Sequence, residues 1–442
     1  MMGEIPIVSK KDVKGNVVLI RVDHNVVKNG MVEDPYRIER TKPTIDFIID
    51  NGGYPILMTH IGRPRDKKGN IAISNNESVD PIVGYINENW GYKAKVVPVD
   101  LSKATERGLP SLDDSINAAL KELKTGKVQI LYLPNIRWFS GEEEKEGQVR
   151  DRFTEQLASI ANIFVNDAFG SPHPHVSTYW VTKELPSFAG FLMRDEIKKL
   201  QYLLNLPGKE HPFLAIVAGE KIDTKIGALE SLRDLADNLL VGGLPANALI
   251  CAKYNVKING IGETETRIAK DLLDKDKTEN KLLIPDLVMV SDIECNKEKQ
   301  RQEGTYRELD LSTIKEGKNL GYVYDVSPNY FKKPEVVNAI NRAKTGFINA
   351  VVGFDKAGFK EGTLVLYQLL DKSTARLYFG GGDTLTALKK YIPDFYKKLI
   401  ENPVKHTLFT GGGTILDGFE SRGVENMKVI NTLIENGGKK PA

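Results

Sequence analysis

Residues 17–25 read VVLIRVDHN, and this stretch indicates the class of fold. Its aliphatic run has the length and bulk of a strand that is buried on both faces, as in parallel sheets. Polar residues follow at once, and Asp23 and Asn25, two residues apart, would share one face of an extended chain. Ligands in open α/β sheets bind beyond the carboxyl ends of the strands. The stretch therefore predicts a buried strand that ends in a polar site, although an Asx turn would also explain Asp23 and Asn25.

Similar apolar runs recur along the chain, at 54–58, 128–133, 163–165, 214–217, 239–241 and 287–290. Helical patterns lie between them, for example at 151–161, where apolar residues recur every three or four positions. Strand, helix and strand repeated in this way predict an α/β fold with parallel sheets covered by helices on both sides. A chain of 442 residues is long enough for two or three domains.

A domain boundary is predicted near residues 198–211. A charged amphipathic helix follows FAGFLM at 188–193, and a new series of strands begins at Leu214. We expect one α/β domain up to about residue 190 and a second from about residue 210, with the helix between them as a hinge.

Composition excludes several classes of function. The net charge of +2 argues against a nucleic-acid partner. No run of about 20 apolar residues indicates a membrane span, and the N-terminus lacks the apolar region of a signal peptide, so we expect a cytoplasmic protein. Cys251 and Cys295 form no CxxC pair and are expected to stay reduced. The only close histidine pair is His173 and His175, which makes a structural zinc site improbable.

Basic side chains lie near predicted strand ends in the first domain. His60 and Arg63 follow the second strand, Arg137 follows a later one, and Arg37 lies in a loop-like stretch after the first. Guanidinium groups match phosphate and carboxylate oxygens, so the set predicts an anion site. Each arginine taken singly could instead pair with a surface acid.

Three glycine-containing segments follow predicted strands in the second domain: AGEKIDTK at 218–225, GGGDT at 380–384 and TGGGT at 410–414. Triglycine turns let backbone N–H groups and a helix N-terminus approach phosphate. Lys221 and Lys225, four residues apart, would lie on one face of a helix start. Asp383 could hold Mg²⁺ on its phosphate side. There is no GxxxxGK[ST] motif, and GIG at 260–262 lacks the third glycine of a dinucleotide fingerprint.

Taken together, the chain resembles the phosphoglycerate kinase family. RVDHN, HIGRP, NIRWF, VNDAFGSPH, LPSFAGFLMRDEI, GEKIDTKI, GGGDT and TGGG occur in the family's order along nearly the whole sequence. The resemblance implies two Rossmann-like three-layer domains joined by a hinge helix. It assigns 1–190 to the acid-substrate domain, with 424–442 packing back on it, 191–209 to the interdomain helix and 210–423 to the nucleotide-binding domain.

The resemblance also implies an acid-substrate site made of Asp23, Asn25, Arg37, His60, Arg63 and Arg137. Asp23 and Asn25 would hold the hydroxyl group of 3-phosphoglycerate. Arg37 would bridge the carboxylate and the moving phosphoryl group, and the other three residues would hold the substrate's phosphate.

On the other domain the resemblance implies a site for ATP or ADP with Mg²⁺. Its nucleotide-binding residues would be Gly219, Lys221, Lys225, Gly242, Gly243, Asn349, Asp355, Gly380, Gly381, Gly382, Asp383 and Thr384. Asp383 would bind the metal, and the catalytic residues would be Arg37, Lys221, Gly382 and Gly412. The expected partners are small molecules only, with no nucleic acid and no membrane, and the expected state is a monomer.

The chain departs from the family pattern at several of these positions. Pro174 replaces an arginine that contacts the substrate phosphate, and His24 replaces a phenylalanine. The family's ribose-binding glutamate falls near Asp355 and Lys356, and Glu220 places a carboxylate beside a phosphate-binding lysine. Three interpretations stay open: a phosphoglycerate kinase of glycolysis and gluconeogenesis, a kinase of this fold for a different carboxylic acid, or a weakly active paralogue that binds nucleotide or a protein.

Overall fold

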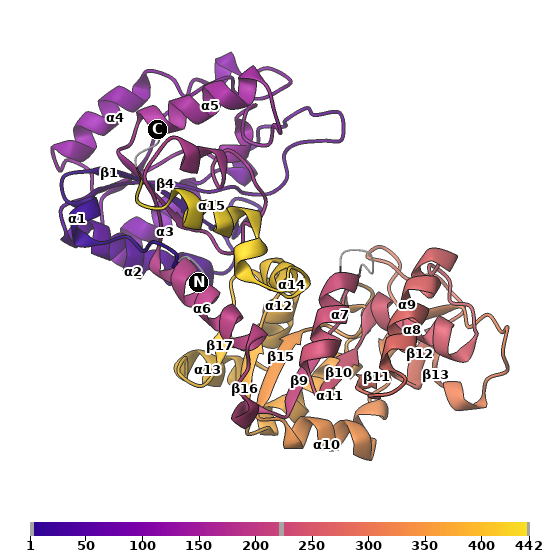
Figure 1. Cartoon of the computed structure of the whole chain (residues 1–442). Coiled ribbons are helices and arrows are strands. Elements are labelled where there is room, and N and C mark those ends of the chain that lie inside the picture. Colours follow the sequence, from indigo (N-terminus) through magenta and orange to yellow (C-terminus); the bar gives the residue numbers. More distant parts are fainter. Residues whose placement is uncertain (1–3, 221–224, 440–442) are drawn as a thin grey trace. The chain divides into compact units, whose positions relative to one another are not determined.

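The computed structural model describes residues 4–220 and 225–439 (Figure 1). The chain divides into two compact units, Met1–Gln201 with Val424–Ala442 and Tyr202–Gly423. The division falls inside helix α6 (Phe191–Leu204), which lies in the segment expected to join two domains. Each unit is built around its own sheet.

The first unit contains a six-stranded sheet in the order β5-β6-β4-β1-β7-β8, and every neighbouring pair is parallel. Its strands are β1 (Val17–Val22), β4 (Tyr54–Met58), β5 (Ala94–Val96), β6 (Ile130–Tyr132), β7 (Ile163–Asp167) and β8 (Ser187–Ala189). All six residues of β1 are buried because the strand lies inside the sheet with both faces covered. The polar residues that follow β1 therefore start from a rigid support.

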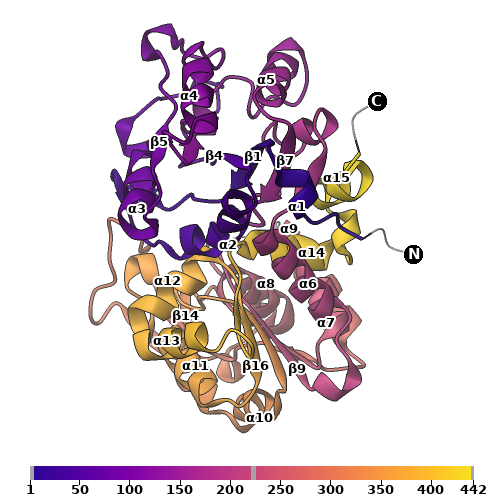
Figure 2. The same cartoon turned by 90° about the vertical axis from the view of Figure 1, so that its left-hand side faces the viewer.

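Helices cover both faces of this sheet (Figure 2). On one face Leu19 and Met58 pack in a core with residues of α4 and α5, and on the other Val18 and Ile20 pack with residues of α2 and α3. The unit's helices are α1 (Lys10–Val13), α2 (Tyr36–Asp50), α3 (Asp80–Trp90), α4 (Ser115–Lys124), α5 (Gln148–Ser159) and α15 (Lys428–Asn436). Its short elements are the hairpin β2 (Val27–Lys28) and β3 (Met31–Val32) and the 3₁₀ turns η1 (Asn75–Glu77), η2 (Leu101–Lys103), η3 (Ile136–Trp138), η4 (Trp180–Lys183) and η9 (Val424–Asn426).

The end of the chain returns to the first unit. Leu433 of α15 belongs to the core that also contains Leu157 of α5, and the hydroxyl groups of Thr182 and Thr432 are 2.8 Å apart. The start of α6 is held in the same unit, because Asp167 Oδ1 accepts the Met193 N–H at 3.0 Å and Thr44 Oγ1 accepts the Phe191 N–H at 2.9 Å. These side chains satisfy N–H groups that a helix start leaves unpaired.

The second unit contains another six-stranded parallel sheet, in the order β11-β10-β9-β15-β16-β17. Its strands are β9 (Phe213–Val217), β10 (Asn238–Val241), β11 (Leu282–Leu283), β15 (Thr345–Asn349), β16 (Arg376–Phe379) and β17 (Thr407–Leu408). Its helices are α7 (Ile226–Leu235), α8 (Gly243–Tyr254), α9 (Glu263–Asp276), α10 (Pro334–Arg342), α11 (Glu361–Lys372), α12 (Gly382–Tyr391), α13 (Pro393–Glu401) and α14 (Gly412–Glu420), and its 3₁₀ turns are η5 (Gly208–Glu210), η6 (Leu311–Thr313), η7 (Tyr330–Lys332) and η8 (Asp355–Ala357). Two parallel sheets with helices confirm the predicted α/β class.

One predicted strand belongs elsewhere. The run at 287–290 was expected to join a parallel sheet, and this prediction was wrong. It forms β12 (Leu287–Ser291), which pairs antiparallel with β13 (Tyr306–Asp310) and β14 (Tyr322–Val326) in a separate three-stranded sheet. Buried and half-buried residues partly alternate along β12, because one of its faces is less covered.

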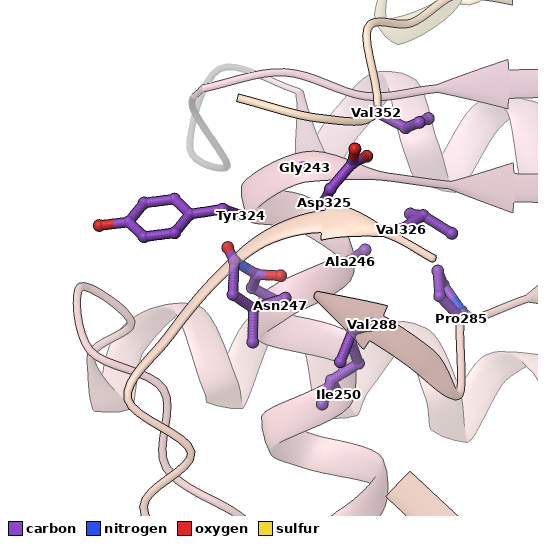
Figure 3. A pocket seen from close by; sticks show the side chains of 11 residues that line it. Gly243, Ala246, Asn247, Ile250, Pro285, Val288, Tyr324, Asp325, Val326 and Val352 are labelled. Carbon is purple, nitrogen blue, oxygen red and sulfur yellow. The ribbon is translucent and has the colours of Figure 1, made fainter. Parts of the chain in front are cut away.

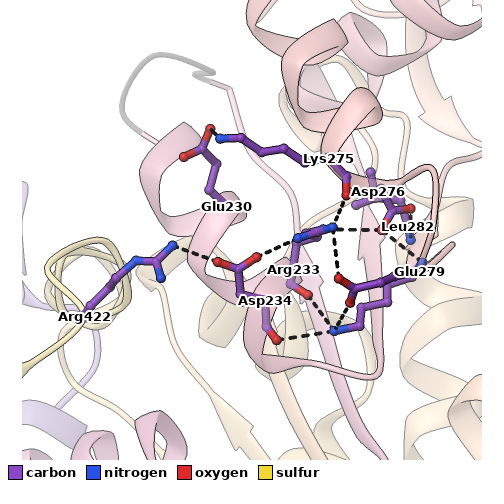
Figure 4. A network of polar contacts seen from close by, with 9 residues as sticks. Glu230, Arg233, Asp234, Lys275, Asp276, Glu279, Leu282 and Arg422 are labelled. Atoms are coloured by element: carbon purple, nitrogen blue, oxygen red, sulfur yellow. Dashed lines mark hydrogen bonds and ion pairs between the residues drawn. The ribbon is translucent and has the colours of Figure 1, made fainter.

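A polar network stabilises the second unit around Arg233, at the end of α7 (Figure 4). Arg233 Nη1 donates to Asp234 at 2.7 Å, and Arg233 Nη2 donates to Glu279 at 3.3 Å. Asp234 also accepts from Arg422 at 2.8 Å. The network joins α7 to the end of α9 and to the turn after α14. None of these side chains was predicted to bind a ligand.

Candidate functional site

In the first unit, Arg21 and His60 form the base of a polar cluster at the end of β1. Arg21 is 2% exposed, and its Nη2 lies 2.9 Å from His60 Nδ1. A guanidinium group can only donate, so Nδ1 accepts and the neutral ring carries its proton on Nε2. Burial and then the charge of Arg21 hold the pKa of His60 well below its ordinary value, which is consistent with a neutral ring.

Asn25 completes a pair of donors with His60. Asn25 Oδ1 accepts the Gly62 N–H at 3.0 Å, which leaves Asn25 Nδ2 at 3.3 Å from His60 Nε2. Both nitrogens carry hydrogen in this arrangement. Two N–H groups that meet at one place suit an oxygen of an anion or a hydroxyl group.

Arg37 and Asp23 form an ion pair beside this cluster. Arg37 Nη1 lies 2.9 Å from Asp23 Oδ2, and the Asp23 side chain is almost fully buried. The other carboxylate oxygen, Oδ1, is buried and has no hydrogen-bond partner. A buried polar atom without a partner is costly, so Oδ1 is available to accept from a ligand hydroxyl group.

The other two predicted arginines differ in how firmly they are held. Arg137 Nη1 donates to the Gly62 carbonyl at 2.6 Å, and Arg137 Nε lies 2.8 Å from Glu143 Oε1. Its charge acts on His60, which places both in one electrostatic environment. Arg63 is exposed. The structure therefore brings Asp23, Asn25, Arg37, His60 and Arg137 together, and leaves Arg63 at the surface beside them.

The side chains that hold Arg21 were not predicted from the sequence. Ser177 Oγ accepts from Arg21 Nε at 2.9 Å and donates to Glu142 Oε1 at 2.5 Å. Glu142 also accepts the Ser177 N–H at 3.0 Å, and its burial raises its pKa to about 7. Arg21 stands in the quoted stretch, but Ser177 lies 156 residues away, and no local pattern pointed to it.

The segment around Pro174 presents histidines in place of an arginine. The rings of His173 and His175 lie edge to face with their centroids 5.9 Å apart, and Pro174 is exposed. Burial, followed by the charge of Arg137, lowers the pKa of His175 to about 3. The His175 ring is therefore neutral near pH 7 and supplies no positive charge in place of the missing arginine.

His24 lies beneath the site rather than in it. Its Nδ1 is 3.0 Å from the Tyr132 hydroxyl, its Nε2 is 2.8 Å from Thr41 Oγ1, and its side chain is fully buried. Thr41 is one helical turn from Arg37 on α2. His24 therefore connects β1, β6 and the helix that carries Arg37.

In the second unit, glycines let the ends of neighbouring strands approach closely. A Cβ on Gly412 would lie 2.1 Å from the backbone of Gly381, and a Cβ on Gly243 would lie 2.6 Å from the Gly219 carbonyl oxygen. Gly243 and Gly381 also have positive φ values, of 62° and 106°. Asn349 Nδ2 donates to the Gly412 carbonyl at 3.0 Å, so the strand ends are linked as well as close.

Helices begin directly at two of these glycine turns. Helix α12 starts at Gly382 and α14 at Gly412, both after short strands of the parallel sheet. Gly382 and Asp383 are exposed, whereas Thr384 is buried. Free N–H groups at helix starts and the helix dipole favour an anion at this edge.

Lys225 reaches the same edge. Its Nζ donates to the Ala218 carbonyl at 2.5 Å and lies 2.5 Å from where a Cβ on Gly219 would be. Burial lowers its pKa to about 8, and the charge of Asp383 partly opposes this shift. Lys221, which was expected to act with Lys225, lies outside the described residues.

Two acidic residues near this edge are paired with lysines. Asp355 Oδ2 lies 3.5 Å from Lys390 Nζ, and Glu220 Oε1 lies 2.6 Å from Lys356 Nζ. The expected nucleotide-binding residues Gly219, Gly243, Asn349 and Gly381 are thus brought together, with Lys225 and the expected catalytic residue Gly412 among them. Asp355 is turned toward Lys390.

A small cavity lies beneath Gly243, between α8 and β14 (Figure 3). Its volume is about 10 Å³, which is room for a water molecule and not for a purine ring. Figure 3 shows the Tyr324 ring pointing away from the other lining side chains. The cavity therefore cannot itself hold a nucleotide base.

Within residues 4–220 and 225–439, no cluster of three or more His, Cys, Asp or Glu side chains could hold a metal ion by itself. Among the same residues, no helix has both the length and the apolar character needed to cross a membrane.

Comparisons with known proteins converge on one family. The family model for phosphoglycerate kinase matches residues 8–422. Phosphoglycerate kinase of Desulforudis audaxviator is 32% identical over 425 residues, which cover 95% of this chain and 97% of that protein. Phosphoglycerate kinase of Trichodesmium erythraeum is 33% identical over 429 residues, covering 94% and 95% respectively.

Solved structures agree. Phosphoglycerate kinase from Coxiella burnetii matches with a TM-score of 0.69 and 26% identity, covering 97% of this chain and all of that one. The enzyme from Pyrococcus horikoshii matches with a TM-score of 0.68 over 96% of this chain and 98% of that one. Its identity is 22%, so this second match bears on the fold alone.

Proposed function

Because the chain belongs to the phosphoglycerate kinase family, we propose that it catalyses reversible phosphoryl transfer between 1,3-bisphosphoglycerate and ADP, giving 3-phosphoglycerate and ATP. The match of the family model over residues 8–422 carries this proposal, together with relatives at 32% and 33% identity over almost the whole chain. The reaction belongs to glycolysis and, in reverse, to gluconeogenesis.

The polar cluster at the end of β1 would bind the acid substrate. Asp23 Oδ1 and Asn25 would hold its hydroxyl group, which suits a buried acceptor that has no partner. The neutral His60 would donate from Nε2 to the substrate phosphate, with Arg137 and Arg63 supplying positive charge. Arg37 would break or share its ion pair with Asp23. Its guanidinium group would then bridge the substrate's carboxylate and the phosphoryl group that is transferred.

The glycine turns of the second unit would bind the nucleotide. Backbone N–H groups at Gly380–Gly382, Thr384 and Gly412 would face the phosphates, with Lys225 and Lys221 as their cations. Gly219, Gly242 and Gly243 would lie against the base, outside the cavity beneath Gly243, because that cavity is too small for it. Asn349 would keep the two glycine turns together through its hydrogen bond to Gly412. Asp355 would bind the ribose after its ion pair with Lys390 breaks.

We propose that Mg²⁺ accompanies the nucleotide at Asp383. The carboxylate is exposed at the start of α12, and magnesium is commonly held by one or two carboxylates plus phosphate oxygens, so a single acid fits. The metal would neutralise charge on the phosphates. Asp383→Ala should weaken Mg-ADP binding by about tenfold or more and leave binding of metal-free ADP nearly unchanged. Equal Mg-ADP affinities by calorimetry would remove this assignment.

The protein's part in the reaction would be positioning and charge neutralisation, since phosphoryl transfer needs no covalent intermediate. Arg37, Lys221, Gly382 and Gly412 would act on the transferred group. We propose that an acid-substrate domain (1–190 with 424–442) and a nucleotide domain (210–423) close about a hinge at 191–209, which would exclude water. Small-angle scattering should then give a smaller radius of gyration with both substrates bound than with either alone.

A second candidate is a kinase of this fold that phosphorylates a different carboxylic acid. The exposed Pro174 favours it, because an arginine at this place would add a charge-assisted contact to the substrate phosphate. A coupled assay with ATP, 3-phosphoglycerate and a panel of other carboxylic acids separates the two. Turnover of 3-phosphoglycerate above that of every other acid supports the first candidate, and preference for another acid supports the second.

We also propose that the enzyme works as a monomer in the cytosol. The cytosolic location is supported by the reaction, whose substrates are small soluble molecules of central metabolism, and the monomeric state is what the resemblance to the family implies. Light scattering of the purified chain at several concentrations should give a single mass of about 49 kDa, matching the 49.2 kDa of the sequence. A mass that rises with concentration would contradict it.

A further inference from the structure

An ion pair joins the ends of two adjacent strands at the edge of the second sheet. Glu220 follows β9 and Lys356 lies in η8 after β15, and these strands pair in parallel with Asn349 opposite Val217. The Lys356 ammonium lies 2.6 Å from Glu220 Oε1.

The surroundings of Lys356 are those of the proposed phosphate site. Strand β16 (Arg376–Phe379), which pairs with β15 on the other side, is followed by Gly380–Thr384, and Lys225 Nζ lies 2.5 Å from where a Cβ on Gly219 would be. The charge of Asp383 acts on both Lys356 and Lys225. Lys356 is therefore a second described cation whose charge interacts with the carboxylate that is proposed to hold Mg²⁺.

We propose that Lys356 binds the phosphates of the nucleotide and that Glu220 is the partner it gives up when they arrive. The inference rests on the proposed function. It names a phosphate-binding residue and a competing carboxylate that the assignments above do not contain.

The exposure of the pair makes such an exchange easy. The side chains of Lys356 and Glu220 are 40% and 54% exposed, and ion pairs in solvent contribute little to stability. A nucleotide phosphate carries more negative charge than one carboxylate, so it is the stronger partner for the ammonium group. Glu220 remains nearby in the complex and repels the phosphates, which weakens binding relative to a neutral side chain.

A purely structural ion pair and an exchange partner predict different directions for the change in ATP affinity when either residue is substituted. If the pair only stabilises the fold, Lys356→Gln and Glu220→Gln should have similar small effects. If the proposal is right, Lys356→Gln should weaken ATP binding by about three- to tenfold, and Glu220→Gln should strengthen it by about two- to fivefold. Lys356→Arg should keep affinity close to wild type.

The experiment is calorimetric titration of the full chain with ATP, ADP and adenosine, at low and moderate salt. Adenosine has no phosphate, so neither variant should change its binding. Lys398→Gln is the matched control, because Lys398 lies 2.8 Å from Asp371 in another ion pair of the same unit, whose lysine side chain is 63% exposed. That variant should bind ATP as wild type does.

Two outcomes overturn the proposal in distinguishable ways. If wild type binds ATP but both variants change affinity in the same direction, or not at all, the pair is structural and the proposed function stands. If the folded wild-type chain binds neither ATP nor ADP, the proposed function and this inference fail together.

Discussion

The two candidate sites are built in different ways. At the end of β1, a buried guanidinium group is held by named side chains, with Arg21 bonded to Ser177 and His60 and Ser177 bonded to Glu142. At the edge of the second sheet, the contacts are mainly between backbones of glycines, such as Gly381 against Gly412. The first site would position ligand groups through a chain of hydrogen bonds, and the second through the close backbone approach that glycines allow.

This difference suggests which substitutions should matter. A small chiral acid needs polar atoms at fixed places, and the buried hydrogen bonds of Arg21, Ser177 and Glu142 hold such atoms in place. The phosphates of a nucleotide can be held by repeated N–H groups, which any backbone carries once it can approach. Substitutions should therefore act through lost polar contacts in the first unit and through steric clashes in the second.

The largest effect is expected at Arg37. Arg37→Ala should lower turnover by about a hundredfold or more, with a smaller change in substrate affinity, because the contact strengthens as charge moves in the transition state. Lys42→Ala is the control, since Lys42 lies on the same helix and pairs with Asp46. Turnover close to wild type in the Arg37 variant would show that Arg37 is misassigned.

The second comparison is made within the glycine turns. Gly412→Ala places a methyl group 2.1 Å from the Gly381 backbone, whereas a methyl group on Gly413 meets no atom within 4 Å. Gly412→Ala should lower the free energy of unfolding by about 1–3 kcal/mol and weaken nucleotide binding, and Gly413→Ala should do neither. Denaturant unfolding and ADP titration of both variants measure this, and equal behaviour would mean that the turns move apart freely.

A third prediction concerns the missing arginine. Pro174→Arg should lower the Michaelis constant for 3-phosphoglycerate by about tenfold, the value of a regained charge-assisted contact, if the loop adapts from the fixed φ of proline.

His175 should add no pH dependence to this Michaelis constant between pH 6 and 8, because its pKa of about 3 keeps it neutral there. His175→Ala should therefore leave the slope of the Michaelis constant against pH unchanged, and a lost slope would show that His175 does titrate.

The smallest effect is expected from the titration of Lys225. Its pKa falls from 10.5 to about 8 because burial disfavours the ammonium form. The charged fraction therefore decreases as pH rises through 8, and affinity for ADP should fall severalfold between pH 7 and 9. Lys225→Arg, which keeps its charge, should flatten this decrease. An equal decrease in both proteins would place the titrating group elsewhere.

Much of the fold could be predicted because parallel strands read as apolar runs. The runs at 54–58 and 163–165 are buried strands as expected, and the family resemblance drawn from the motifs is confirmed by the match over residues 8–422. The run at 287–290 was assigned to the wrong sheet, because its apolar residues resemble those of a parallel strand whichever partner pairs with it. Periodicity predicts burial and does not identify the neighbouring strand.

The candidate sites were likewise predictable in their residue types and not in the contacts and charges of those residues. The residue types of Asp23, His60, Arg37 and the glycine turns are visible in the sequence, since charge, hydrogen-bonding groups and the lack of a Cβ are properties of single residues. Their protonation and partners depend on what packs around them. His175 stays neutral because it is buried near Arg137, and Ser177 meets Arg21 because the tertiary structure brings together residues 156 positions apart. The sequence by itself determined which chemical groups are available, and only the tertiary structure decided their charge and contacts, because burial and through-space distance are not local properties of a chain.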